Sequence, residues 1–280
     1  MTHRPSRSFA VFRHAVLLLG ALVYLMPFVW MLATSLKSPD QIFAASLSLW
    51  PEGGLGPALD NYTAALTRVP LLTYLLNGVI VCAGILVLQI LVTLPAAYAF
   101  AKLKFRGKQL GWALVLLGLL IPYQATAIPL YVMFHYMGLL DTYLGLMLPF
   151  VFSAFGIFLL RQYFMTVPDD LINAARLDGF SEFELVWRIM LPTAKTALLA
   201  FAIFSVVWHW NDYFWPLLVT SSPELATPPL GTVFFRNEEA GTEFGPLMAG
   251  TVLITLPLLL LFLVFQRRFI EGVTLSSVKG

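Results

Sequence analysis

Long apolar stretches recur along this chain, and each has about 20 residues or more. A bilayer core about 30 Å thick requires about 20 helical residues to cross it. Of all residues, 59% are hydrophobic and 11% are charged, whereas a soluble domain carries about 25% charge. The sequence therefore predicts a single transmembrane domain over residues 1–280. The predicted spans are residues 15–34, 73–99, 110–132, 142–161, 197–219 and 247–266.

These stretches favour helices over the strands of a barrel. Inside lipid only helices and closed barrels satisfy the backbone, and the stretches are too long and too uniformly apolar for barrel strands. Several contain proline, which neighbouring helices in a membrane bundle accommodate. The first stretch has a basic lead like a signal peptide, but its apolar run exceeds the usual core of about 7–15 residues. We therefore predict an all-α membrane protein with six transmembrane helices and an uncleaved first span.

The basic residues indicate which loops face the cytoplasm. With the N-terminus inside, all but three of the 17 Lys and Arg fall in cytoplasmic segments, as the positive-inside rule requires. The loop 100–109 is the strongest signal, because it holds four cations and no acid. The sequence therefore predicts that both termini are cytoplasmic. The basic residues expected outside are Lys37, Arg68 and Arg236.

Charge and cysteine content exclude several classes of function. The net charge of +2, without one basic patch, gives no reason to expect binding to nucleic acid. The single cysteine, Cys82, excludes an intrachain disulfide and a cysteine-rich metal site. The chain has no P-loop pattern, so no nucleotide site is predicted within it. We expect no catalytic residue, cofactor or metal in this chain.

The polar segment 162–196 lies between the fourth and fifth predicted spans. Pro168, followed by two aspartates, suits the start of a short helix. Gly179 suits the left-handed residue that ends it. Ser181 and Glu184 then have the capping-box spacing of a second helix. The segment therefore predicts two short helices joined by a turn.

Each of these short helices has an apolar face. Leu171, Ala174 and Ala175 share a face of the first helix, and Pro192 is expected to close the second. Helices of about ten residues are marginal alone and require a partner surface. Periodicity leaves two interpretations open, namely packing on the chain's own bundle or membrane surface, and docking of a cytoplasmic protein. The apolar stripe of the second helix is Phe183, Val186, Trp187 and Met190.

The segment resembles the EAA loop of binding-protein-dependent ABC importer permeases. The match is the spacing Ala-Ala-x3-Gly-x9-Ile-x-Leu-Pro. The family also has Asp178 before the glycine, whereas Asn173 stands where the family usually has Glu, which removes a charge that could pair with the ATPase. In that family this loop couples the permease to its ATPase, and Gly179 would set the angle between the two helices. The resemblance implies coupling roles for Asn173, Ala174, Ala175, Asp178, Gly179, Phe183, Ile189, Leu191 and Pro192.

Further stretches are similar to the carbohydrate-type permeases of this family, in particular the second permease of the maltose and glycerol-3-phosphate type. They extend from the first predicted span to the C-terminal residues. The matching stretches are Pro27 with 35–37, Asn61-Tyr62, 97–102 with 105–107, Trp210-Asn211-Asp212, 272–274 and 278–280.

The resemblance implies a permease subunit that moves a sugar or sugar-like solute, of oligosaccharide or glycerol-phosphate type, by alternating access. It implies a heterodimer with a second homologous permease and two cytoplasmic ATPase subunits, which bind ATP and Mg. It also implies an extracytoplasmic solute-binding protein. Hydrolysis belongs to the ATPase subunits, so this chain is not expected to be an enzyme. The near-neutral outer loops offer no clear phosphate site.

Polar groups inside predicted spans are the default candidates for the solute path. Asn211 and Asp212 stand among aromatic residues that include Trp208, and Tyr123 with Gln124 forms a similar group. Aromatic faces with a few amide or carboxyl partners suit a polyol. The alternatives are that Trp and Tyr mark the membrane interface and that Asn211 bridges helices. The histidine at 209 is expected to be structural or interfacial.

An ion-coupled secondary transporter is the main alternative function. It usually has buried carboxylates or repeats, but only Asp212 is an acid expected within a span, and no internal repeat is apparent. An intramembrane enzyme lacks an HExxH or GxSxG motif here. A channel would have no use for a docking segment. Each alternative predicts function without an ATPase partner.

Overall fold

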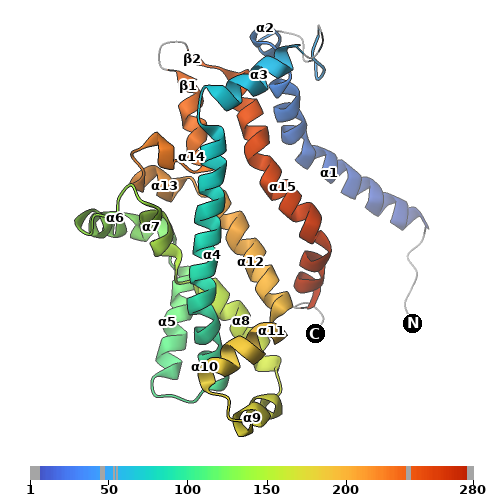
Figure 1. Cartoon of the computed structure of the whole chain (residues 1–280). Helices are drawn as coiled ribbons and strands as arrows, with labels where there is room; N and C mark the ends of the chain where they lie inside the picture. Colours follow the sequence, from blue (N-terminus) through green and yellow to red (C-terminus); the bar gives the residue numbers. More distant parts are fainter. Residues whose placement is uncertain (1–6, 45–47, 53, 55, 238–240, 276–280) are drawn as a thin grey trace. The chain divides into compact units, whose positions relative to one another are not determined.

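The computed structural model describes residues 7–44, 48–52, 54, 56–237 and 241–275 (Figure 1). The described chain is helical except for one short antiparallel ladder between β1 (Arg236–Asn237) and β2 (Gly241–Thr242). It divides into two compact units, Met1–Leu71 with Thr232–Leu256, and Leu72–Gly231 with Pro257–Gly280. The predicted family motif at 278–280 lies outside the described residues.

The first unit is organised around the end of its long N-terminal helix. The Asn61 side chain donates hydrogen bonds to the backbone oxygens of Ser35 (3.0 Å) and Lys37 (2.8 Å). Gly245 packs so closely against Asn61 that a Cβ at this position would collide with the Asn61 side chain. The segment 35–72 therefore contains a helix whose Asn61 side chain fixes it to the end of the N-terminal helix. The helices of this unit are α1 (Arg7–Ser35), α2 (Pro39–Ile42), α3 (Gly56–Thr67), η5 (Thr232–Phe235) and the start of α15 (Phe244–Leu275).

The second unit carries both candidate sites. In it α8 packs against α5 and α12, and α13 packs against α6 and α7. Its helices up to the fourth predicted span are α4 (Leu71–Lys102), α5 (Lys108–Leu120), η1 (Tyr123–Thr126), α6 (Ala127–Tyr136), α7 (Tyr143–Met147), η2 (Leu148–Phe150) and α8 (Ala154–Thr166). Those that follow are α9 (Asp169–Leu177), α10 (Glu182–Glu184), η3 (Leu185–Met190), α11 (Leu191–Thr193), α12 (Lys195–Trp210), α13 (Phe214–Val219), η4 (Pro223–Leu225) and α14 (Pro228–Gly231).

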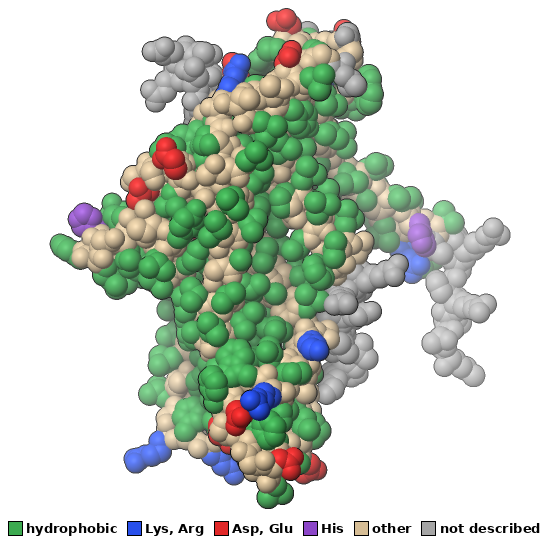
Figure 2. Space-filling model, viewed as in Figure 1, with side chains coloured by type: hydrophobic (Ala, Val, Ile, Leu, Met, Phe, Trp, Pro, Cys, Tyr) green, Lys and Arg blue, Asp and Glu red, His purple; other side chains and the backbone are tan. Residues whose placement is uncertain are grey.

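The described helices include three that are long and apolar enough to cross a membrane unbroken, over Val11–Ser35, Leu71–Lys102 and Phe244–Gln266. Three bent helix pairs raise the number of spans to as many as six. The helical fold class is therefore confirmed. Figure 2 agrees with a membrane location, because the visible side chains of α4 and α5 are mostly hydrophobic, while charged side chains gather around α9 and α10.

The third, fourth and fifth predicted spans are not continuous helices, which corrects the sequence-based expectation. Lys108–Leu120 and Tyr123–Tyr136 meet at 100°, because Ile121 is extended (φ −81°, ψ 118°) before Pro122. The fourth span bends by 46° where Ser153 caps α8. The fifth is interrupted between Trp210 and Phe214. Irregular backbone at membrane depth is tolerated where it is buried in protein or lines a water-filled cavity.

Candidate functional site

The polar segment 162–196 begins with the predicted short helix. Helix α9 follows Pro168 and ends at Leu177, and Gly179 has a φ of +87°, so the predicted left-handed glycine is confirmed. The predicted apolar face of α9 is only partly covered by its neighbours. Ile172 and Ala175 are buried, whereas Leu171 and Ala174 are exposed. The first helix therefore presents Leu171 and Ala174 to the surface and buries Ile172 and Ala175.

The second helix starts as predicted and ends later than predicted. Ser181 Oγ accepts from the Glu184 N–H (3.3 Å), and the Glu184 carboxylate accepts from the Ser181 N–H (3.1 Å), which confirms the capping box. Pro192 does not close this helix. The helical backbone continues from Met190 through Pro192 to Thr193. The chain bends by 84° at Ala194, where α12 begins.

The inner faces of α9 and η3 pack on the same unit's own helices. Leu185 and Met190 are fully buried against residues of α4 and α8, and Ile189 and Leu191 pack partly buried on the same cluster. The opposite surface remains exposed, with Leu177 90% and Phe183 70% accessible. The buried faces therefore fit packing on the chain's own bundle, and the exposed surface remains available for docking of another protein. The exposed members of the predicted coupling set are Asn173, Ala174, Asp178, Gly179, Phe183 and Pro192.

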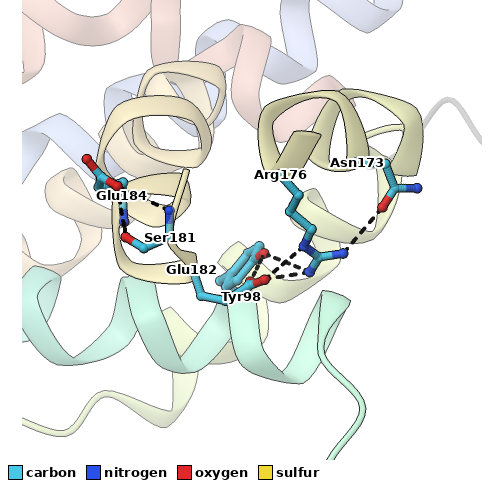
Figure 3. A network of polar contacts seen from close by, with 6 residues as sticks. All are labelled: Tyr98, Asn173, Arg176, Ser181, Glu182 and Glu184. Atoms are coloured by element: carbon cyan, nitrogen blue, oxygen red, sulfur yellow. Dashed lines mark hydrogen bonds and ion pairs between the residues drawn. The ribbon is translucent and has the colours of Figure 1, made fainter. Parts of the chain in front are cut away.

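A polar network ties these helices to α4 (Figure 3). Glu182 accepts from the Tyr98 hydroxyl (2.6 Å) and forms an ion pair with Arg176 (2.8 Å). The Arg176 guanidinium also donates to Asn173 Oδ1 (3.3 Å). The Asn173 side chain therefore points back to its own helix. These hydrogen bonds and the ion pair connect α9 and α10 to the end of α4.

A second tie lies at the start of α9. Lys102 Nζ, at the end of α4, donates to the backbone oxygen of Val167 and to Asp169 Oδ1, both at 2.6 Å. The hydrogen bond from Lys102 and its positive charge hold the pKa of Asp169 below its ordinary value. Lys102 thus holds the start of the polar segment in place, in addition to being one of the basic residues that indicate the cytoplasmic side.

The predicted solute-path residues meet in one cavity of about 450 Å³ at the break between α12 and α13. Asp212 Oδ1 accepts from the Tyr123 hydroxyl (2.9 Å) and from the Phe214 N–H (3.1 Å), so it caps α13 and fixes Tyr123. Asn211 donates to the backbone oxygen of Val207 (2.7 Å) within its own helix. The geometry gives Asp212 a structural role. The lining residues with exposed side chains are Gln124, Val207, Trp208, Asn211 and Tyr213.

Sequence reasoning missed a buried polar pair beside this cavity. Ser205 Oγ donates to Gln89 Oε1 (2.6 Å), and Gln89 Nε2 donates to the backbone oxygen of Phe150 (2.9 Å). A glutamine inside the apolar run 73–99 was the available signal, because an uncompensated amide is costly in lipid.

Comparison with known proteins identifies the family. Residues 89–274 match the family described as binding-protein-dependent transport system inner membrane component. The chain belongs to this family. It is therefore a membrane-embedded, multi-pass permease subunit of an ABC importer.

Relatives of the permease match it over nearly its whole length. The arabinooligosaccharides transport system permease protein AraQ of Bacillus subtilis (strain 168) is 32% identical over 284 residues, covering 99% of each chain. The sn-glycerol-3-phosphate transport system permease protein UgpE of Yersinia pestis is 34% identical over 276 residues, covering 97% of this chain and 98% of that one.

A solved structure supports the fold of the permease. A chain in the crystal structure of a bacterial ABC transporter involved in the import of the acidic polysaccharide alginate superposes with a TM-score of 0.83. Its sequence identity is 24%, and the match covers 96% of this chain and 100% of that chain. The interrupted spans therefore belong to a fold already observed in an importer.

Proposed function

We propose that this permease carries a sugar or sugar-like solute across the cytoplasmic membrane by alternating access. The observation that carries the proposal is whole-length similarity to permease proteins of an arabinooligosaccharide and an sn-glycerol-3-phosphate transport system. The cavity at the break between α12 and α13 supports it, since it combines aromatic faces with amide groups. Broken helices commonly line the solute sites of transporters.

Two cytoplasmic ATPase subunits are proposed to supply the energy for transport. They, rather than this chain, would bind ATP and Mg. The exposed surface of Leu171, Leu177 and Phe183 is their proposed docking face. A soluble protein that covers these side chains would remove apolar surface from water, at about 25 cal/mol per Å². The Tyr98–Glu182–Arg176 network would then transmit closure of the ATPases to α4.

The remaining partners follow from the same family membership. A second homologous permease would complete a heterodimer, and an extracytoplasmic solute-binding protein would deliver the solute. Both termini and the docking face would lie in the cytoplasm, as the distribution of Lys and Arg predicts. The chain would lie in the cytoplasmic (inner) membrane, and no nucleic acid takes part.

The test is purification of the tagged chain in mild detergent, followed by mass spectrometry of the proteins that accompany it. We expect a homologous permease and an ATPase. Phe183→Glu should release the ATPase and retain the permease, because it places a charge in the apolar docking face. Leu49→Glu, at an exposed leucine of the outer segment, is the matched control.

Two outcomes would contradict the proposal. If the wild-type chain is recovered alone and stable in several mild detergents, the proposed partners and their docking face are wrong. If Phe183→Glu retains the ATPase as well as Leu49→Glu does, the docking face is placed wrongly.

A further inference from the structure

A second cavity, of about 490 Å³, lies next to the one at Asn211, and Trp208 lines both. Most of its other walls are aromatic or aliphatic, but three polar side chains of α4 and α12 reach it. These polar residues are Gln89, Ser205 and His209. None of the three belongs to the predicted solute path.

The two cavities lie at the interruptions of three spans. The first is lined by Tyr123 and Gln124, at the break of the third span, and by Asn211–Phe214, at the break of the fifth. The second is lined by Phe150 and Ser153, at the break of the fourth. Non-helical backbone at membrane depth is stable beside a cavity that holds water or a polar solute. The placement therefore favours a hydrated passage over a lipid-filled crevice.

The hydrogen bonds within the cluster of Gln89, Ser205 and His209 show which donor has no partner. Because Gln89 Oε1 accepts from Ser205 Oγ, the other end of the amide is the donor, and it lies 3.3 Å from His209 Nε2. That nitrogen must therefore be the acceptor, which places the ring proton on His209 Nδ1. Nδ1 is buried and has no hydrogen-bond partner among the described residues. The cluster thus retains one unpaired N–H donor, beside the second cavity.

The charge of the lining indicates what kind of solute fits. Neither cavity has a Lys or Arg among the described residues that line it, and the first has the carboxyl group of Asp212. A phosphate or carboxylate would therefore find no cation there to pair with. Trp208, 61% exposed, and the ring of Phe150, 4.6 Å from that of His209, provide apolar faces. Apolar faces with a few fixed polar groups are typical of a site for an uncharged ligand.

We propose that the two cavities form one subsite for a neutral sugar, with Trp208 as the shared wall and His209, held by Gln89, as the polar partner of one of its hydroxyl groups. The inference rests on the proposed function and narrows it. It selects an uncharged saccharide over a phosphorylated or acidic one. Gly118 borders the second cavity, and a Cβ there would meet only Ala154 at 3.4 Å, so a longer side chain can extend into the space.

The test uses the complete importer, with its partner permease, ATPases and binding protein, reconstituted in liposomes. Uptake of radiolabelled arabinotriose and of sn-glycerol-3-phosphate is measured against concentration, together with ATP hydrolysis. We expect uptake of arabinotriose only. Trp208→Ala and Gly118→Leu should each raise KM for uptake about tenfold. The matched controls are Phe262→Ala, an exposed aromatic of α15, and Gly20→Leu, at a glycine with open space in α1.

The other outcomes separate the subsite from the proposed function. If arabinotriose is taken up but both variants keep the wild-type KM, the subsite is wrong and the proposed function stands. If sn-glycerol-3-phosphate is the solute taken up, the inference of a neutral solute is wrong. If a phospholipid purifies with the wild type and is lost from Gly118→Leu, the second cavity is an acyl-chain site. If the wild type takes up neither probe, the proposed function itself fails.

Discussion

Gly179 is the residue whose backbone most directly shapes the polar segment. Its φ of +87° is strained for any L side chain, although a Cβ there would meet nothing within 4 Å. Gly179→Val should therefore cost about 1–2 kcal/mol through backbone strain alone. We expect transport by the reconstituted importer to fall severely and membrane insertion to persist.

The matched control for Gly179→Val is Gly179→Asn, because asparagine visits the left-handed region more readily. It should retain most of the transport, and both variants are compared by solute uptake and by membrane content on immunoblots. Wild-type uptake by Gly179→Val would show that the angle at this residue does not matter.

Asp141 is the one non-glycine residue with positive φ in the described chain, and its carboxyl group joins two loops. It accepts from the N–H groups of Ser221 and Ser222 (both 3.0 Å) and from Ser222 Oγ (2.9 Å). The backbone hydrogen bond from Ser222 contributes most to holding its pKa below the ordinary value. The folded state therefore favours the charged form.

This lowered pKa predicts a pH-dependent stability. The stabilisation is present above the unfolded pKa of about 3.9 and is lost as the pH falls through the lower folded pKa. Asp141→Asn should thus lower Tm at pH 7, and the difference from wild type should shrink towards pH 3. Thermal unfolding in detergent at several pH values measures it, with the exposed Asp40→Asn as control. A difference independent of pH would contradict the role of the charge.

Local chemistry explains which single residues were predictable. Gly179 and the Ser181–Glu184 box are signals within a few residues, and both have the predicted geometry. The partners of Gln89 and His209 could not be predicted. They lie 120 positions apart, and their hydrogen bond exists only after α4 and α12 have packed. Likewise, periodicity marks an apolar face of α9 but not which side its neighbours cover.

Among the elements, α4 and α10 are joined by the hydrogen bond from Tyr98 to Glu182 (2.6 Å). Tyr98→Phe removes this bond and leaves Glu182 paired with Arg176. We expect the free energy of unfolding to fall by about 1 kcal/mol, because Glu182 is half exposed and water replaces part of the interaction. We also expect less solute moved per ATP hydrolysed, since α10 is then less firmly tied to α4.

Both effects of Tyr98→Phe are measured on the reconstituted importer, by thermal unfolding and by the ratio of uptake to hydrolysis. Tyr24→Phe, at an exposed tyrosine of α1, is the control. If Tyr98→Phe lowers Tm but keeps the wild-type ratio, the bond is structural and carries no coupling.

Helix boundaries were less predictable than helix existence. Proline does not by itself locate a break, because α1, α4 and α15 run through Pro27, Pro95 and Pro257. The chain breaks beside Pro122 instead, where Ile121 adopts an extended conformation. Pro192 lies two residues before a bend rather than at it. These differences depend on how neighbours satisfy the freed backbone groups, which the sequence pattern does not encode.

At the scale of the whole molecule, the orientation is the prediction with the widest consequence. In a Cys82→Ala background, Arg106→Cys should react with an impermeant maleimide only after the cells are permeabilised. Leu49→Cys should react in intact cells. The background reactivity of wild type is expected to be low, because Cys82 is buried. The opposite labelling pattern would invert the topology and place the exposed face of α9 and α10 outside.

The interrupted spans also have a mechanical consequence. A continuous helix resists bending, because each turn must stretch or break hydrogen bonds of its own backbone. In this chain the regular helical hydrogen bonding is already interrupted near residues 121–122, 151–153 and 211–213. Rotation at such a point changes the torsion angles of a few residues and leaves the rods on either side intact. A force applied to one helical segment then causes rotation at the break next to the cavities, rather than bending along the whole helix.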